Sequence, residues 1–326
     1  MITIYDSHAS GLARRDGLVT PEAGTVWIDL YNPTREEELH IEGVLGIELP
    51  TREEMKEIEA SSRLYQEDGA QFMTATLVTQ IDDPWPVTSH VTFVLVKDKL
   101  VTIRYCEPYA FYMLTKRAMA NQIESASAGA ILIGLLEQII DRLADLIERM
   151  QGDIDKLSQT VFSSGKDQRA NGERYDQALK IVGRQGDLTT RARESLLSIN
   201  RLLTFFAFAC EQASDSTDNK AVRQRIKTAS RDAGSLSDHL NYLNGQITLL
   251  LDATLGLINI DQNRIIKIFS VVSVVFMPPT LVASIYGMNF HAMPELSWQW
   301  GYPLAILVMV FSAVGPLMFF RHKGWL

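Results

Sequence analysis

The chain has 326 residues, of which 46% are hydrophobic and 21% charged, and its formal net charge is −8. Residues 1–262 hold 27 of the 31 Lys and Arg and 38 of the 39 Asp and Glu, whereas residues 263–326 are mostly apolar and carry +3. This division excludes a single soluble domain and indicates a polar body followed by a lipid-soluble tail. The acidic body argues against nucleic acid as a partner.

Two further features lead us to expect the polar body in the cytoplasm. Cys106 and Cys210 belong to no CxxC or Cys/His cluster, so we expect both thiols to be reduced, as in a cytosolic protein. The N-terminal residues lack the charged start and long apolar run of a signal peptide.

Residues 1–125 are predicted to form a small α/β domain. Val26, Ile28 and Leu30 alternate as in a half-buried strand, and residues 72–78 are similar. Residues 90–96 and 100–105 are β-rich runs on either side of a polar Lys-Asp-Lys turn, which predicts a hairpin.

Two helix starts lie between these strands. Thr34 is followed three residues later by Glu37, and Thr51 by Glu54. Each pair has the spacing of a capping box, in which the hydroxyl and the carboxylate satisfy unpaired backbone N–H groups.

A long helical region follows the domain. No proline occurs from residue 109 to residue 277, and two polar breaks divide this stretch into expected helices near 130–162, 173–213 and 219–286. The third helix has an apolar seam with spacings of three and four residues and one gap at Thr254, as in a helical bundle. Its members are Ala233, Leu236, Leu240, Leu243, Ile247, Leu250 and Leu257.

Two membrane spans end the chain. The 23 residues between Lys267 and His291 carry no charge and would rise about 34 Å as a helix, enough to cross a bilayer core of roughly 30 Å. A further 25 uncharged residues separate Glu295 from Arg321. Basic residues flank both spans on one side only, so the positive-inside rule places both termini in the cytoplasm.

The expected segments are therefore an α/β domain, a cytoplasmic helical hairpin, a stalk helix, a first transmembrane helix, a periplasmic loop, a second transmembrane helix and a basic tail. Their predicted boundaries are 1–125, 126–215, 216–267, 268–290, 291–297, 298–320 and 321–326.

A polar stripe runs along the first span. Asn263, Ser270, Met277 and Ser284 recur every seven residues, and Asp252 and Asn259 continue the same face upstream. Such a face suits a water-filled lumen, although Asn and Ser also join membrane helices by hydrogen bonds. Pro278 and Pro279 mark either a simple kink or a pore-facing helix. Because two spans cannot enclose a path alone, a conducting protein of this layout must oligomerise.

The sequence Tyr286-Gly287-Met288-Asn289-Phe290 ends the first span, and a short Met-Pro-Glu-Leu loop and a second span follow. This arrangement resembles the CorA family of magnesium channels, whose hallmark is Gly-Met-Asn at that place. Residues 263–284 are similar to the proteobacterial branch, and weaker similarity extends through the α/β domain.

The resemblance implies an α+β membrane protein that forms a funnel-shaped homopentamer in the lipid of the bacterial inner membrane. It implies passive uptake of Mg²⁺, with Co²⁺ and Ni²⁺ as further cargo, and closure by regulatory intracellular Mg²⁺. The family's selectivity filter corresponds to Gly287, Met288 and Asn289, with Asn289 as the metal-facing ring. Its pore-lining positions correspond to Asn263, Phe269, Met277, Thr280 and Ser284, its lumen carboxylate to Asp252, and its basic collar to Arg264, Lys267, Arg321 and Lys323.

The chain departs from the family at two places. Thr228 stands where a relative has a regulatory aspartate on the stalk helix, and Asp232 and Asp238 are the nearby substitutes. His291 stands where relatives often have Glu, and a protonated histidine there would weaken cation capture. An acidic helix between residues 137 and 155 is a second possible ion site, with a solvated face as the plainer interpretation.

Two alternatives remain open. The first is a zinc transporter of the same superfamily, similar to ZntB, against which the Met-Pro-Glu-Leu loop argues. The second is a membrane-anchored scaffold without a pore, which would need the helices but not the polar stripe. No nucleophile–base pair, P-loop, dinucleotide fingerprint or HExxH motif points to an enzyme.

Overall fold

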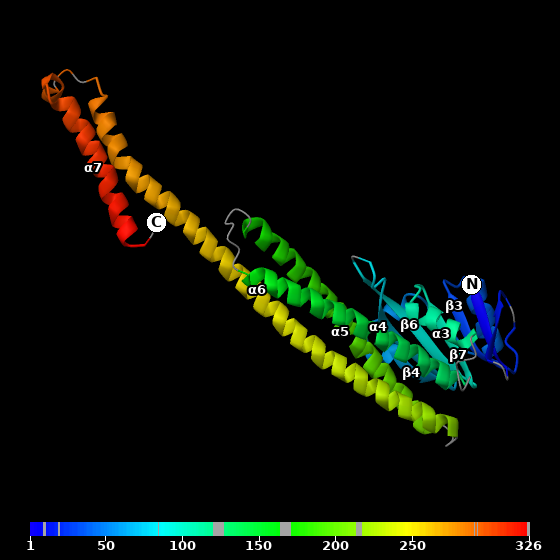
Figure 1. The fold of residues 1–326 in the computed structure, drawn as a ribbon. Coiled ribbons are helices and arrows are strands. Elements are labelled where there is room, and N and C mark those ends of the chain that lie inside the picture. The colour runs from blue at the N-terminus through cyan, green and yellow to red at the C-terminus, as the bar shows by residue number, and fades with distance from the viewer. Residues whose placement is uncertain are drawn as a thin grey trace. The chain divides into compact units, whose positions relative to one another are not determined.

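The computed structural model describes residues 1–8, 11–18, 20–83, 85–119, 127–163, 171–212, 217–289, 291 and 293–324. The chain divides into two compact units, Met1–Ser164 with Gln177–Leu250, and Gly165–Asp176 with Leu251–Leu326. The first holds a sheet domain and long helices, and the second holds two apolar helices (Figure 1). This is the expected α+β architecture.

A seven-stranded sheet in the order β2-β1-β3-β7-β6-β5-β4 forms the N-terminal domain. Only β3 and β7 pair in parallel among the described strands. The strands are β1 Ile2–His8, β2 Gly11–Asp16, β3 Thr25–Tyr31, β4 Leu64–Glu67, β5 Ala70–Thr79, β6 Val87–Val96 and β7 Lys99–Arg104. The predicted hairpin is confirmed, because β6 and β7 are joined by Lys97 and Asp98. Both residues have positive φ, which a two-residue turn needs if it is to match the twist of the two strands.

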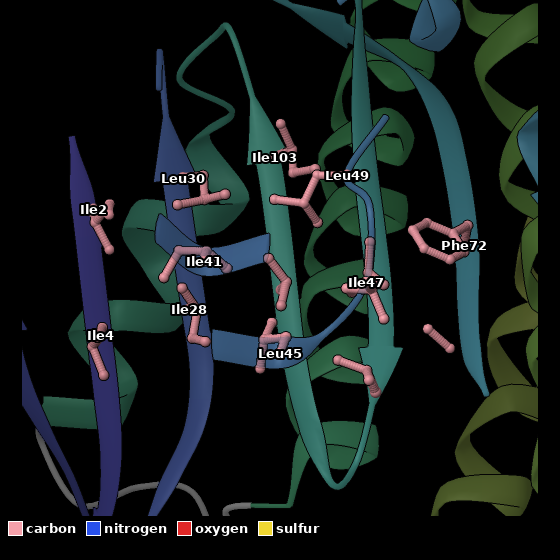
Figure 2. Close-up of a cluster of buried hydrophobic side chains, with 14 of the residues drawn as sticks. Ile2, Ile4, Ile28, Leu30, Ile41, Leu45, Ile47, Leu49, Phe72 and Ile103 are labelled. Carbon is pink, nitrogen blue, oxygen red and sulfur yellow. The ribbon is translucent and has the colours of Figure 1, made fainter. Parts of the chain in front are cut away.

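Strand β3 is buried on both faces, so the prediction of a half-buried strand was wrong. Ile28 and Leu30 are buried as expected, but Trp27 and Asp29 on the opposite face are buried too, and Val26 is only partly buried. The reason is the position of β3 inside the sheet, because α1 (Arg35–Leu45) contributes to an apolar cluster on one face and α3 (Tyr109–Met119) and α4 (Ala128–Phe162) cover the other. Figure 2 shows that cluster, with Ile41 and Leu45 of α1 over Ile28 and Leu30.

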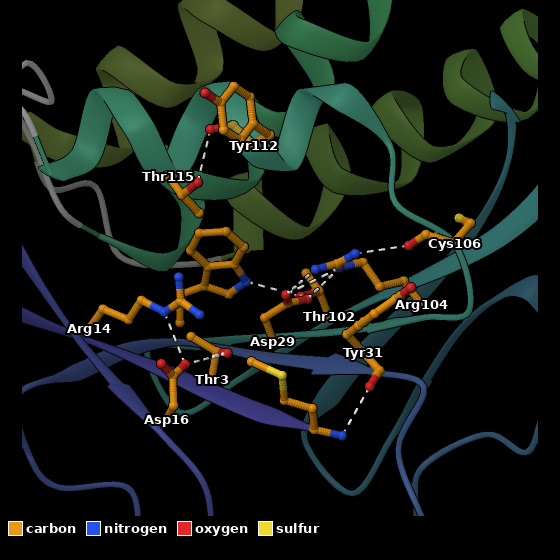
Figure 3. A network of polar contacts seen from close by, with 12 residues as sticks. Thr3, Arg14, Asp16, Asp29, Tyr31, Thr102, Arg104, Cys106, Tyr112 and Thr115 are labelled. Atoms are coloured by element: carbon orange, nitrogen blue, oxygen red, sulfur yellow. Dashed lines mark hydrogen bonds and ion pairs between the residues drawn. The ribbon is translucent and has the colours of Figure 1, made fainter. Parts of the chain in front are cut away.

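A polar network lies on the face that α3 covers (Figure 3). Trp27 donates from Nε1 to the Thr102 hydroxyl at 3.0 Å, and that hydroxyl donates to Asp29 at 2.7 Å. The Arg104 guanidinium bonds both Asp29 oxygens and lies over the rings of Tyr31 and Phe111. Asp29 and Arg104 therefore satisfy one another in a buried setting where an unpaired charge would be costly.

Both predicted capping boxes form. Thr34 accepts from the Glu37 N–H while the Glu37 carboxylate accepts from the Thr34 N–H, and α1 begins there. Thr51 and Glu54 make the same exchange. The element that follows Thr51 is only the single 3₁₀ turn η1 (Glu54–Lys56), and the short helix α2 (Ala60–Arg63) comes after it.

The long helices lie where the sequence places them. Helices α4, α5 (Asn171–Gln212) and α6 (Thr217–Tyr286) agree with the expected ranges to within three residues at each end. The seam on α6 is buried at Ala233, Leu240, Leu243, Ile247 and Leu250, and half-buried at Leu236 and Leu257. The predicted gap at Thr254 was wrong, because this side chain is fully buried and continues the seam.

Candidate ion-conducting helix

The second unit contains two helices that are long and apolar enough to cross a membrane, the end of α6 and α7 (Gly301–His322), with the 3₁₀ turn η3 (Pro294–Ser297) between them. Only 11% of the apolar window of α6 and none of that of α7 is buried within the chain. Soluble proteins rarely leave such continuous apolar surface open to water. Lipid or further copies of the chain must therefore cover these helices.

The candidate pore residues share one helix. Asp252, Asn263, Met277 and Ser284 all lie on α6, and at about 100° per residue Asn263, Met277 and Ser284 fall within about 60° of one another. Phe269 and Thr280 lie on the flank of this stripe, about 80° and 60° from Met277. All of these side chains are exposed, Phe269 at 68% and Met277 at 69%.

The opposite side of α6 is packed. Val271 and Val275 are only 3% and 9% exposed, and they lie about 120° and 160° around the helix from Met277. The intramolecular packing of this span thus uses the face away from the polar stripe. The stripe is left open for water or for other copies of the chain.

Hydroxyl groups on this span bond their own helix. Ser270 donates from Oγ to the carbonyl of Ile266 at 2.8 Å, and Thr280 donates to the carbonyl of Phe276 at 2.7 Å. Each hydroxyl hydrogen is thereby engaged, while oxygen lone pairs remain to accept from water. Pro278 and Pro279 lie inside α6 and leave two carbonyls of the preceding turn without helical N–H partners.

The Gly-Met-Asn segment follows the end of α6 directly. Gly287 donates to the carbonyl of Ala283 at 2.9 Å, Met288 donates to Ile285 at 3.3 Å, and Asn289 leaves the helix with an exposed side chain. A Cβ on Gly287 would lie 3.1 Å from the Ala283 oxygen, so glycine permits a tight backbone approach at this turn. Phe290, the next residue of the motif, lies outside the described residues.

The four residues of the basic collar are exposed and lie at matching ends of the two spans. Arg264 and Lys267 precede the first apolar run, and Arg321 and Lys323 end the second. About twenty residues separate Lys267 from Gly287, and twenty separate Gly301 from Arg321. Each helix therefore rises about 30 Å between its basic end and the loop.

The regulatory candidates lie in the first unit. Asp232 and Asp238 are exposed on α6, and Thr228 bonds its own helix at Gln224. Across from them, the pKa of Asp141 on α4 is raised by burial and by its carboxylate neighbours Glu137, Asp145 and Asp232.

The acidic face of α4 is mostly solvated, as the plainer interpretation predicted. Its exposed carboxylates are Asp141, Asp145, Glu148, Asp153 and Asp155, whereas the half-buried Glu137 is paired with Arg225 of α6 through two hydrogen bonds. Within the described part of the chain, no group of three or more His, Cys, Asp or Glu side chains is arranged to hold a metal ion. Sequence reasoning did not anticipate that Asp232 of α6 acts on Asp141 of α4, because a spacing within one helix does not identify a partner on another helix.

Two apolar spans with a polar stripe along one of them are the arrangement expected of a membrane transport protein. A sequence model of the family described as "CorA-like Mg2+ transporter protein" matches residues 22–322. The chain is 36% identical over 306 residues to the magnesium transport protein CorA of Escherichia coli K12. The aligned segment covers 94% of this chain and 93% of that protein. The chain belongs to the CorA family.

Solved structures agree on the fold. The complete structure of the CorA magnesium transporter from Methanocaldococcus jannaschii matches with a TM-score of 0.75 at 19% identity, over 100% of this chain and 99% of that chain. The cytoplasmic domain of ZntB from Vibrio parahaemolyticus matches with a TM-score of 0.54 at 11% identity, over 79% of this chain and 97% of that chain. ZntB is the more distant of the two.

Proposed function

We propose that the chain is one subunit of a passive Mg²⁺ channel, and that copies of α6 surround the conducting path. The observation that carries this proposal is the exposed stripe from Asp252 to Ser284, which lies away from the packed Val271 and Val275 and ends at Asn289. A scaffold would need the two spans but would not require a polar stripe along one of them.

The chemistry of the stripe fits a hydrated ion. Mg²⁺ dehydrates reluctantly and usually keeps several waters. Those waters donate hydrogen bonds, and the amide oxygen of Asn289 and the hydroxyl oxygens of Thr280 and Ser284 accept them. A neutral ring at the mouth binds less tightly than a carboxylate ring, which favours release as well as entry.

The assembly, location and cargo belong to the same proposal. We infer a homopentamer in the lipid of the bacterial inner membrane with both termini in the cytoplasm, and we expect Co²⁺ and Ni²⁺ to pass as well. In this arrangement Phe269 and Met277 form a hydrophobic constriction, and the basic collar surrounds the inner mouth. The uncovered apolar surface of the two spans supports an oligomer, and the basic flanks support the orientation.

Regulation by intracellular Mg²⁺ is proposed for the carboxylates of the stalk. Asp232 and Asp238 are exposed and would meet a neighbouring copy in a ring of stalk helices. Burial, and then the carboxylates of Glu137, Asp145 and Asp232, raise the pKa of Asp141. A divalent cation would relieve the repulsion among these carboxylates, which supports a role for this region.

Flux into liposomes tests the function. The purified protein should carry Mg²⁺, and Asn289→Ala should reduce the initial rate at least tenfold, whereas the matched control Asn244→Ala, an exposed residue of α6 outside the span, should not. Transport of Zn²⁺ without Mg²⁺ would support the zinc alternative. An assembled protein without flux would support the scaffold, and native mass spectrometry gives the number of subunits.

A further inference from the structure

A small cavity in the sheet domain has a lining that the transport function does not use. Its volume is about 120 Å³. Three basic and three hydroxyl residues line it, from the loop before η1, from η1, from β6 and from the residue after β7, and Met55 adds an apolar wall. Thr88 and His90 point to the same face of β6, whereas the Ser89 side chain points to the other face and lies beside the Thr79 hydroxyl. The polar lining residues are Arg52, Lys56, His90, Thr88, Ser89 and Tyr105.

No carboxylate is part of this lining. The Arg52 guanidinium lies 4.8 Å over the ring of Tyr105, a contact that leaves its N–H groups available. Tyr105 donates its hydroxyl to Glu38 at 3.3 Å, so a nearby carboxylate is already engaged. Neither Arg52 nor Lys56 forms an ion pair or a hydrogen bond through its side chain with another described residue. Arg52 and Lys56 are both exposed at the rim of the cavity, and no described carboxylate holds either of them in an ion pair.

The geometry around His90 indicates the same excess of positive charge. Its Nε2 lies 3.3 Å from Nη2 of Arg63, and because arginine can only donate, the imidazole accepts there and carries its proton on Nδ1. Burial, then Arg63 and Lys56, lower the pKa of His90 against the opposing effect of Glu194. Arg63 is itself partly buried, and it donates to the Thr76 hydroxyl at 2.9 Å.

We propose that this cavity binds a phosphate group, either as free orthophosphate or as the terminal phosphate of a nucleotide. The volume equals about four water molecules at roughly 30 Å³ each, which suits a tetrahedral oxyanion of five heavy atoms. Arg52 and Lys56 supply charge-assisted hydrogen bonds, and Thr88 supplies a neutral donor. A bound anion would offset the positive charge that faces His90.

Equilibrium dialysis of the full-length protein in detergent with ³²P-orthophosphate and, separately, with labelled ATP tests the proposal. We expect saturable binding of at least one of the two that is at least tenfold weaker in the double variant Arg52→Gln, Lys56→Gln. The matched control Arg117→Gln, Lys180→Gln removes the same charge from exposed positions outside the cavity and should bind like the native chain. Binding of orthophosphate alone identifies a free anion, and binding of ATP alone identifies a nucleotide.

NMR of the imidazole signals measures the pKa of His90, which addition of ligand would not change if Arg52 and Lys56 had only a structural role. The chain has only six histidines, so the signal of His90 can be assigned with His90→Gln. Saturating ligand should raise the pKa of His90, and the cavity double variant should abolish that rise. Absence of binding by both ligands, or equal binding by the cavity variant and the native chain, overturns the proposal. Neither result depends on ion flux, so it leaves the proposed transport untouched.

Discussion

Gly287 donates its N–H to the carbonyl of Ala283 at 2.9 Å, and a methyl group on Gly287 would lie 3.1 Å from that same oxygen. The turn that carries Asn289 out of the helix is therefore built on a contact that only a missing side chain allows without displacement. Because the neighbour is backbone and cannot rotate aside, any larger residue must shift the turn itself.

Substitution Gly287→Ala is the first prediction. We expect the Mg²⁺ flux of reconstituted protein to fall about tenfold or more, since displacement of the turn by a few tenths of an ångström misplaces the Asn289 side chain, while the protein still assembles. The control is Gly315→Ala on α7, where an added Cβ meets nothing within 4 Å. Equal flux in both variants would show that the close approach at Gly287 is irrelevant to conduction.

The second prediction concerns Met277. An apolar ring in a narrow pore resists wetting, so Met277→Ser should ease water entry and raise flux under conditions that close the native channel, such as high internal Mg²⁺. Val272→Ser is the matched control, because Val272 is also exposed but lies about 140° around the helix from Met277. A rise in flux in both variants would point to a general loosening of the span.

The buried pair of the sheet domain gives the third prediction. The side chains of Arg104 and Asp29 are only 12% and 6% exposed, so Asp29→Asn leaves an uncompensated guanidinium and should cost about 3–5 kcal/mol of stability. The change is measurable by circular dichroism as a lower unfolding midpoint. Asp16→Asn removes a pair with Arg14 whose side chains are 50% and 40% exposed, and it should cost less than about 1 kcal/mol.

The ion pair between α4 and α6 gives a fourth prediction, of a small effect. Glu137 and Arg225 are joined by two hydrogen bonds, but their side chains are 34% and 40% exposed, so water screens the attraction. We expect Glu137→Gln to lower stability by about 1 kcal/mol or less. A loss comparable to that of Asp29→Asn would indicate that this pair is shielded from water in the assembled protein.

The fifth prediction follows from His90, whose folded-state pKa is lowered by burial and by Arg63 and Lys56. As the pH falls, His90 of the unfolded chain is therefore protonated at a higher pH than His90 of the folded chain. The stability that the neutral imidazole contributes is complete above about pH 6.5, the ordinary value for histidine, and is lost as the pH falls toward the folded-state pKa. In buffers without phosphate, the unfolding midpoint should fall less between pH 7.5 and 5.5 for His90→Gln than for the native chain. His239→Gln, at an exposed position, should leave that slope unchanged.

The helical half of the molecule was predictable because its information is local. Asn263, Met277 and Ser284 lie on a single helix, so helical periodicity alone shows that they share a face. Pro108 and Pro278 bound a proline-free stretch that holds α4 and α5 entirely, with α6 continuing past it. Thr254 was misjudged because a threonine in an apolar seam looks like an interruption, although its side chain is fully buried.

The sheet domain was less predictable because its contacts are non-local. The strands β1, β2 and β4 and the helix α3 went unrecognised, and nothing near Ile2 and Ile4 shows that β1 pairs with β3. The two-sided burial of β3 depends on strand order, which a single sequence does not reveal. The cavity at His90 is lined by residues from separate segments of the chain, so no sequence motif could have predicted it.

The hydroxyl hydrogens of Ser270 and Thr280 are tied to carbonyls of their own helix. At these two heights the proposed passage therefore presents lone pairs and no O–H donor. A chloride ion surrounded by water seeks donors and would find none there, whereas a hydrated cation finds acceptors. Exclusion of anions at these positions would then need no fixed negative charge, which leaves the passage free of the tight binding that a charged ring would impose on a divalent ion.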